Sequence, residues 1–145
     1  MLRCKLCCLL LAAATHRTSA NAACPAVSPP TDFDVQQWAA NPAGGNFSWY
    51  FHQMMPILYL PKTSFYCAAA RYSSDGPNKV KVYNYDNKGK VNGAAHSTNI
   101  CGTVANASEP AELTVAPCFL PLSLGGPYWV LHFDDDEGLG LISGG

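Results

Sequence analysis

Runs of alternating apolar and polar residues, each closed by a turn, constrain this sequence more than any other feature. Residues 65–73 end at the turn Ser74-Asp75-Gly76-Pro77, and residues 127–134 end at Asp135-Asp136-Glu137-Gly138. A period of two is typical of strands, because successive side chains of a strand point to opposite faces of a sheet. We therefore predict a mostly antiparallel β protein.

The clearest strand is the third, where Lys79 and Lys81 alternate with Val80 and Val82. Its lysines are expected to face water and its valines the interior. Seven strands are predicted in all, at residues 49–54, 66–73, 79–85, 91–98, 111–116, 128–133 and 139–143, with a little more sheet at 102–104. A short helical turn is expected at 33–38 and a hairpin turn at 86–89.

The first 22 residues are predicted to be a secretory signal peptide. Arg3 and Lys5 precede an apolar run, residues 6–14, that is too short to span a bilayer, and Ala20-Asn21-Ala22 is typical of a cleavage site. A buried core helix is the alternative. Cleavage after Ala22 leaves residues 23–145, a length that suits one domain with one core.

Four of the seven cysteines remain after cleavage, which are Cys24, Cys67, Cys101 and Cys118. In an oxidising compartment an even set favours two disulfides, and three pairings are open. Cys101 and Cys118 flank the fifth strand and are the best candidates for a local pair. No two of the four have the short spacing of a paired-ligand zinc site, so no metal is expected.

Charge and glycosylation signals agree with secretion. Because Arg3, Lys5 and Arg17 leave with the signal peptide, six basic residues remain against ten acidic ones, a net charge of −4. This sign argues against nucleic acid and anionic membranes as partners. Asn46-Phe47-Ser48 and Asn106-Ala107-Ser108 match the N-glycosylation rule. We expect a secreted soluble protein whose contact with membranes is at most transient.

Six pieces in this order resemble the lipocalin family, with the apolipoprotein D and bacterial-type lipocalins nearest in pattern. They are Phe33-Asp34, Trp49-Tyr50, Cys67 with Ala70-Arg71-Tyr72-Ser73, Val80-Lys81-Val82, Pro110-Ala111-Glu112-Leu113-Thr114-Val115, and Pro127-Tyr128-Trp129-Val130-Leu131 with Asp134. The resemblance implies an all-β, up-and-down antiparallel barrel of lipocalin type. About seven of the eight strands have counterparts, whereas the last strand and the C-terminal helix have none, so we expect an incomplete barrel with open edges that invite self-association.

A barrel of this kind encloses one small ligand, and its inward side chains decide which ligand it accepts. The resemblance and strand parity together predict binding and transport of a small hydrophobic molecule of the fatty acid, retinoid, sterol or carotenoid class, without a cofactor. Tyr72, Tyr128 and His132 are expected to offer polar tips to it. The full predicted set is Ala68, Ala70, Tyr72, Val80, Val82, Leu113, Val115, Tyr128, Val130 and His132. The alternative for each of these residues is that it only fills a core.

Two other functions are alternatives to transport. Some relatives of lipocalins are isomerases or epoxide-converting enzymes, and Cys67 is a conceivable thiol nucleophile, but its parity with Arg71 directs it outward. The second alternative is that the chain is a secreted interaction module. The resemblance also implies that Cys24 and Cys67 have partners beyond Gly145, although the residues alone allow them to pair. The acidic run 134–137 is interpreted as a hairpin turn in preference to a calcium site.

Overall fold

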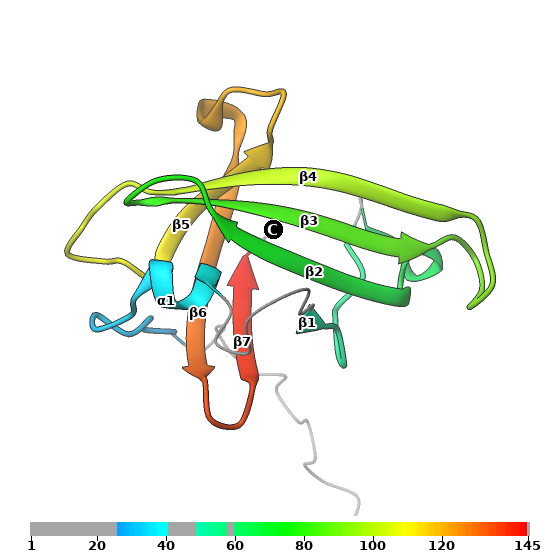
Figure 1. Ribbon diagram of the computed structural model, residues 1–145, viewed down its shortest axis with the longest axis horizontal. Coiled ribbons are helices and arrows are strands. Elements are labelled where there is room, and N and C mark those ends of the chain that lie inside the picture. Colours follow the sequence, from blue (N-terminus) through cyan, green and yellow to red (C-terminus); the bar gives the residue numbers. More distant parts are fainter. Residues whose placement is uncertain (1–25, 41–48, 58–59, 145) are drawn as a thin grey trace, which may run out of the picture.

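The computed structural model describes residues 26–40, 49–57 and 60–144 of this chain. Within these residues seven strands form a single sheet in the order β1-β2-β3-β4-β5-β6-β7, and each strand is antiparallel to the next along the chain. The sheet curls so that β5 to β7 lie across from β2 to β4, giving a half-barrel with a concave inner face (Figure 1). The predicted all-β, up-and-down architecture of a barrel-like fold is confirmed.

Most strands lie where the alternation predicted them. The elements are α1 (Val35–Ala40), β1 (Trp49–Tyr50), the 3₁₀ turn η1 (Lys62–Ser64), β2 (Tyr66–Ser74), β3 (Lys79–Asn87), β4 (Ala95–Val104), β5 (Glu112–Pro117), the 3₁₀ turn η2 (Leu122–Leu124), β6 (Gly126–Asp134) and β7 (Leu139–Gly144). The predicted ends of β2, β3, β5, β6 and β7 differ from these by two residues or fewer.

The first strand and the fourth differ most from expectation. β1 has two residues where 49–54 was predicted, because among the described residues that follow it a single backbone bond, from Phe51 N to Ala68 O at 3.1 Å, continues the contact with β2. The strand predicted at 91–98 begins four residues too early, because 91–94 belong to the turn; its remainder and the predicted segment 102–104 are parts of one longer strand, β4, which pairs with β3 without interruption from Ala95 to Thr103. Their small polar residues carry a weak pattern, and pairing to β3 supplies the order instead.

Helix α1 begins at Val35 because Asp34 caps it. The Asp34 carboxylate accepts bonds from the backbone N–H groups of Gln36 at 2.7 Å and Gln37 at 3.1 Å, which satisfies two donors of the first turn. The side-chain amide of Gln36 then donates to the carbonyls of Gly76 and Pro77 at 2.9 and 3.0 Å. These bonds fix α1 beside the β2–β3 turn. The predicted turn at 33–38 is two residues early.

The core lies between α1 and the concave face of the sheet. Trp38 of α1 is only 2% exposed, and its ring lies 4.2 Å from that of Tyr72 and 5.6 Å from that of Phe33, measured between centroids. Phe33 lies 6.1 Å from Phe133 of β6 in an edge-on arrangement, a geometry that aromatic pairs prefer. The helix thus covers one end of the concave face, and we name this the closed end.

Trp49 connects the two sides of the half-barrel. Its ring, which comes from β1, lies 6.1 Å from that of Phe133 on β6. A side chain at Gly140 of β7 would approach the same indole to 3.9 Å. The first and last strands of the sheet therefore face each other across the concave side with an aromatic ring between them.

Candidate functional site

The predicted ligand-binding residues gather mainly on the concave face. Seven of them are buried, namely Ala68, Ala70, Tyr72, Val80, Val82, Leu113 and Val130; Val115 and Tyr128 are half-buried; and His132 is exposed. Gly102 shows how closely the apolar members meet, because a Cβ there would lie 2.9 Å from Val80 and 3.2 Å from Val115. The alternation of strands thus brings most of the predicted set together.

The two predicted tyrosines occupy the closed end and bond to each other. The hydroxyl oxygens of Tyr72 and Tyr128 lie 2.6 Å apart, so each finds its partner within the protein. Burial raises the pKa of Tyr72 to about 12, and the bond from Tyr128 partly offsets this rise. Burial, with the nearby Tyr72, also raises the pKa of Tyr128 well above its usual value. One hydroxyl donates to the other in this bond, so the two groups lie buried against each other, while the hydrogen of the accepting hydroxyl is not used by it.

His132 does not share the inward face on which its prediction rested. Val130 pairs with Ile142 and His132 pairs with Leu141, so Leu131 is an extra residue that forms a β-bulge. A bulge of this kind reverses the alternation beyond it. His132 is exposed, whereas Val130 is 1% exposed. The inward prediction for His132 is therefore wrong, and nothing in the residue pattern marks the bulge.

Cys67 lies at a second bulge and faces away from the core. The register of β2 against β3 slips between Tyr66 and Ala69, and Cys67 has a φ of 53°, a left-handed conformation that residues other than glycine adopt rarely. Its thiol is exposed, forms no disulfide among the described cysteines, and donates to the carbonyl oxygen of Val91 at 3.7 Å. As predicted, Arg71 is also exposed. Both line an open hollow of about 330 Å³, together with Tyr50, Ala69, Ala70, Tyr83 and Tyr85.

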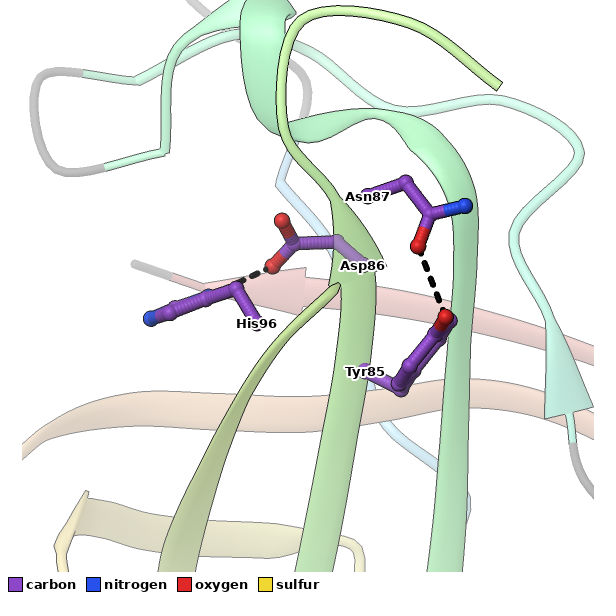
Figure 2. A network of polar contacts seen from close by, with 4 residues as sticks. All are labelled: Tyr85, Asp86, Asn87 and His96. Carbon is purple, nitrogen blue, oxygen red and sulfur yellow. Dashed lines mark hydrogen bonds and ion pairs between the residues drawn. The ribbon is translucent and has the colours of Figure 1, made fainter. Parts of the chain in front are cut away.

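Residues that were not singled out for function form a polar pair on the concave face. Asp86 of β3 stands opposite His96 of β4, and its Oδ2 lies 2.9 Å from His96 Nδ1 (Figure 2). Figure 2 also shows Tyr85 and Asn87 on the other side of β3, where their side chains share a bond of 2.7 Å. Asp86 therefore has the same parity as the inward Val80 and Val82.

The concave face changes in polarity along the strands. From the β2–β3 turn, the inward positions of β3 are Val80, Val82, Asn84 and Asp86, and their partners on β4 are Gly102, Ile100, Thr98 and His96. Thr98 is exposed and Asn84 is half-buried, so this end of the concave face is not filled. We name it the open end, and it is defined by Asn84, Asp86, His96 and Thr98.

The cysteines and the acidic turn agree with the sequence predictions that they test. Cys101 and Cys118 form a disulfide, and a bridge of this kind is compatible with an oxidising secretory compartment. Asp134 accepts a bond from Glu137 N at 2.8 Å and closes the β6–β7 hairpin turn, as expected. Asn106 is exposed in the turn after β4. Residues 1–22, Cys24 and Asn46 lie outside the described residues.

Among the described residues, no helix has the length and apolar character needed to cross a membrane, and no three His, Cys, Asp or Glu side chains gather as a metal site would require. Comparisons with known proteins add no identity to this geometry. No protein-family model matches the chain, and no curated protein matches it. The fold class rests on the structure itself: an antiparallel half-barrel with an aromatic closed end and a polar open end.

Proposed function

We propose that this chain is a lipocalin-like carrier that binds a small hydrophobic molecule within its half-barrel. The observation that supports the proposal is the uneven filling of the concave face. Trp38 and Tyr72 pack tightly at the closed end, while Thr98 stays exposed at the open end. Small apolar ligands favour concave, mainly apolar sites with a few polar groups.

The middle of the concave face is the part that fits an apolar ligand. Trp49, Ile100 and Phe133 are half-buried there and border the buried core. A ligand that covered their remaining apolar surface would gain about 25 cal/mol for each Å² removed from water. The proposal therefore assigns the ligand's apolar body to these three residues. It assigns stability, and not ligand contact, to Tyr72 and Tyr128.

Secretion belongs to the same proposal. The Cys101–Cys118 disulfide supports passage through an oxidising compartment. Modification at the exposed Asn106, and at Asn46, would follow from that route. Mass spectrometry of protein expressed with its leader in a eukaryotic host tests both points. Secretion with residue 23 at the N-terminus agrees with the proposal, and retention of the unprocessed chain inside the cell contradicts it.

Binding can be tested with a brominated long-chain alcohol, because bromine quenches tryptophan fluorescence only at short range. The chain has three tryptophans. Trp49 borders the concave face, whereas Trp129 lines an outer hollow between β5 and β6. We expect saturable quenching that Trp49→Phe largely removes and the matched control Trp129→Phe retains. The absence of saturable quenching by alcohols, fatty acids and retinoids in folded protein would overturn the proposal.

Cys67 provides a control that separates transport from thiol chemistry. Its sulfur is exposed and lines the outer hollow with Arg71. Cys67→Ser should therefore leave binding on the concave face unchanged. A loss of binding in this variant would contradict the assignment of the ligand to the concave face.

A further inference from the structure

Asp86 is a buried polar group of the concave face that is only partly hydrogen-bonded. It is 7% exposed, and one carboxylate oxygen, Oδ2, is bonded to His96. The other oxygen, Oδ1, is buried and has no hydrogen-bond partner among the described residues. Buried polar atoms are nearly always paired in folded proteins, and one that is not carries a free-energy penalty. A hydrogen-bond donor that reaches such an acceptor removes this free-energy penalty.

The surroundings of Asp86 favour a donor from outside the protein. Ala68 and Ala70 of β2 lie on the inward face near it, and their methyl groups bring no hydrogen-bond donor to Oδ1. Thr98, two residues after His96 on β4, is exposed on the same face. His96 is 40% exposed at its side chain, so the pair reaches from the buried carboxylate to the solvent. Access to Asp86 therefore lies through the open end.

We propose that Asp86 selects the ligand's polar end, and that this end is a neutral or cationic hydrogen-bond donor, an alcohol or an amine. The inference rests on the proposed function and specifies its ligand class. A hydroxyl or ammonium group donates to Oδ1 and satisfies it. A carboxylate brings no proton and places a second negative charge beside Asp86, which the low polarity of a buried site makes unfavourable. Free fatty acids are accordingly disfavoured.

Strand geometry gives the length of the apolar body. Val82, at the edge of the closed end, and Asp86 are four residues apart on β3. At about 3.3 Å for each residue, this separation is about 13 Å. An extended chain of roughly ten carbons covers such a length. Ile100 pairs with Val82 and, with Trp49 and Phe133, borders the buried core along this span.

Four ten-carbon probes test the inference by isothermal titration calorimetry: 1-decanol, decylamine, decyl methyl ether and decanoate. The ether lacks a donor but keeps the tail, and decanoate is an anion. For the unmodified protein we expect 1-decanol and decylamine to bind about tenfold more tightly than either of the other two, the range expected for one hydrogen bond to a charged group. Decanoate binding as tightly as 1-decanol would overturn the inference.

Asp86→Asn keeps the shape of the side chain and removes its charge. We expect the preference for 1-decanol over decanoate to fall to about threefold or less. Decylamine should no longer bind more tightly than decyl methyl ether or decanoate. Asp75→Asn is the matched control, because it removes the same charge from an exposed position in the β2–β3 turn. An Asp86→Asn protein that keeps the full preference would show that another group selects the ligand, and would reject the inference.

The outcomes distinguish the two proposals. If all four probes bind the folded protein without regard to their head groups, the carrier proposal stands and the role of Asp86 is wrong. If none binds, the carrier proposal fails and the inference fails with it. The probe series on the unmodified protein decides between these outcomes even if Asp86→Asn does not fold.

Discussion

The hydroxyl pair of Tyr72 and Tyr128 provides the sharpest test of the closed end. The two oxygens lie 2.6 Å apart beneath Trp38, and no other bond is shown for either hydroxyl within the described residues. Replacing one tyrosine by phenylalanine removes one hydroxyl and leaves the other buried without a partner. Such a group costs about 1–3 kcal/mol, whereas removing both hydroxyls together costs much less.

The two single substitutions should cost similar amounts. Both hydroxyls are buried, which raises the pKa of Tyr72 to about 12 and the pKa of Tyr128 well above its usual value. We expect Tyr128→Phe and Tyr72→Phe each to lower the free energy of unfolding by about 2 kcal/mol. The double variant should lose less than the two single losses combined, with a coupling of about 1 kcal/mol or more.

Urea denaturation followed by circular dichroism measures all four proteins. With a urea dependence of about 1–3 kcal/mol per molar for a small domain, the expected losses move the midpoint by a few tenths of a molar or more. Coupling below about 0.3–0.5 kcal/mol, which is the scatter expected for independent sites, would refute the hydroxyl bond. Such a result would also return Tyr72 and Tyr128 to the set of possible ligand contacts.

Four further predictions concern stability and assembly. Burial raises the pKa of Tyr72 from 10.0 to about 12, so the unfolded state loses this proton at a lower pH than the folded state. The free energy of unfolding should therefore fall by about 1.4 kcal/mol per pH unit between pH 10 and pH 12. Denaturation at several pH values should show a smaller fall in Tyr72→Phe/Tyr128→Phe. Cys101→Ala/Cys118→Ala opens a loop with a sequence separation of 17 and should lower the free energy of unfolding by about 3 kcal/mol. Adding reductant should cause the same loss in the unmodified protein and no loss in the variant. Asp34→Ala removes the cap of α1 and should lower thermal stability by about 1 kcal/mol, whereas the neighbouring Asp32→Ala should not. The sheet edge at β7 exposes Leu139, Leu141 and Ile142, so the protein should self-associate in sedimentation velocity and Leu141→Lys should reduce this; a concentration-independent monomer before mutation would contradict it.

Strand alternation predicted much of the sheet because burial on one face repeats every second residue. Val80, Val82 and Leu113 are buried as their parity required, and the local Cys101–Cys118 pair is confirmed. The pattern fails where the chain gains or loses a residue. The extra residue at Leu131 turns His132 away from the face of Val130, and hydrophobicity alone contains no signal for such an insertion.

Asp86 was missed for a related reason. A hairpin turn at 86–89 assigned it to a loop, whereas β3 continues to Asn87 and β4 resumes at Ala95. The longer connection shifts the register so that Asp86 meets His96 inside the sheet. Register in a hairpin depends on the length of its turn, and a small polar segment specifies that length weakly. The available clue was an acidic residue, Asp86, with the same strand parity as Val80 and Val82.

The two ends of the concave face divide stability from recognition in physical terms. At the closed end, Tyr72 and Tyr128 share one hydrogen bond beneath the buried Trp38, and burial keeps both hydroxyls from an incoming group. At the open end, Asp86 Oδ1 has no hydrogen-bond partner within the part of the chain that the structure describes, and such a buried atom carries a free-energy penalty. Proteins tolerate such local costs mainly at sites that act on another molecule. The unequal satisfaction of the two ends thus favours a bound ligand whose polar group lies at Asp86 and whose apolar body points toward the core.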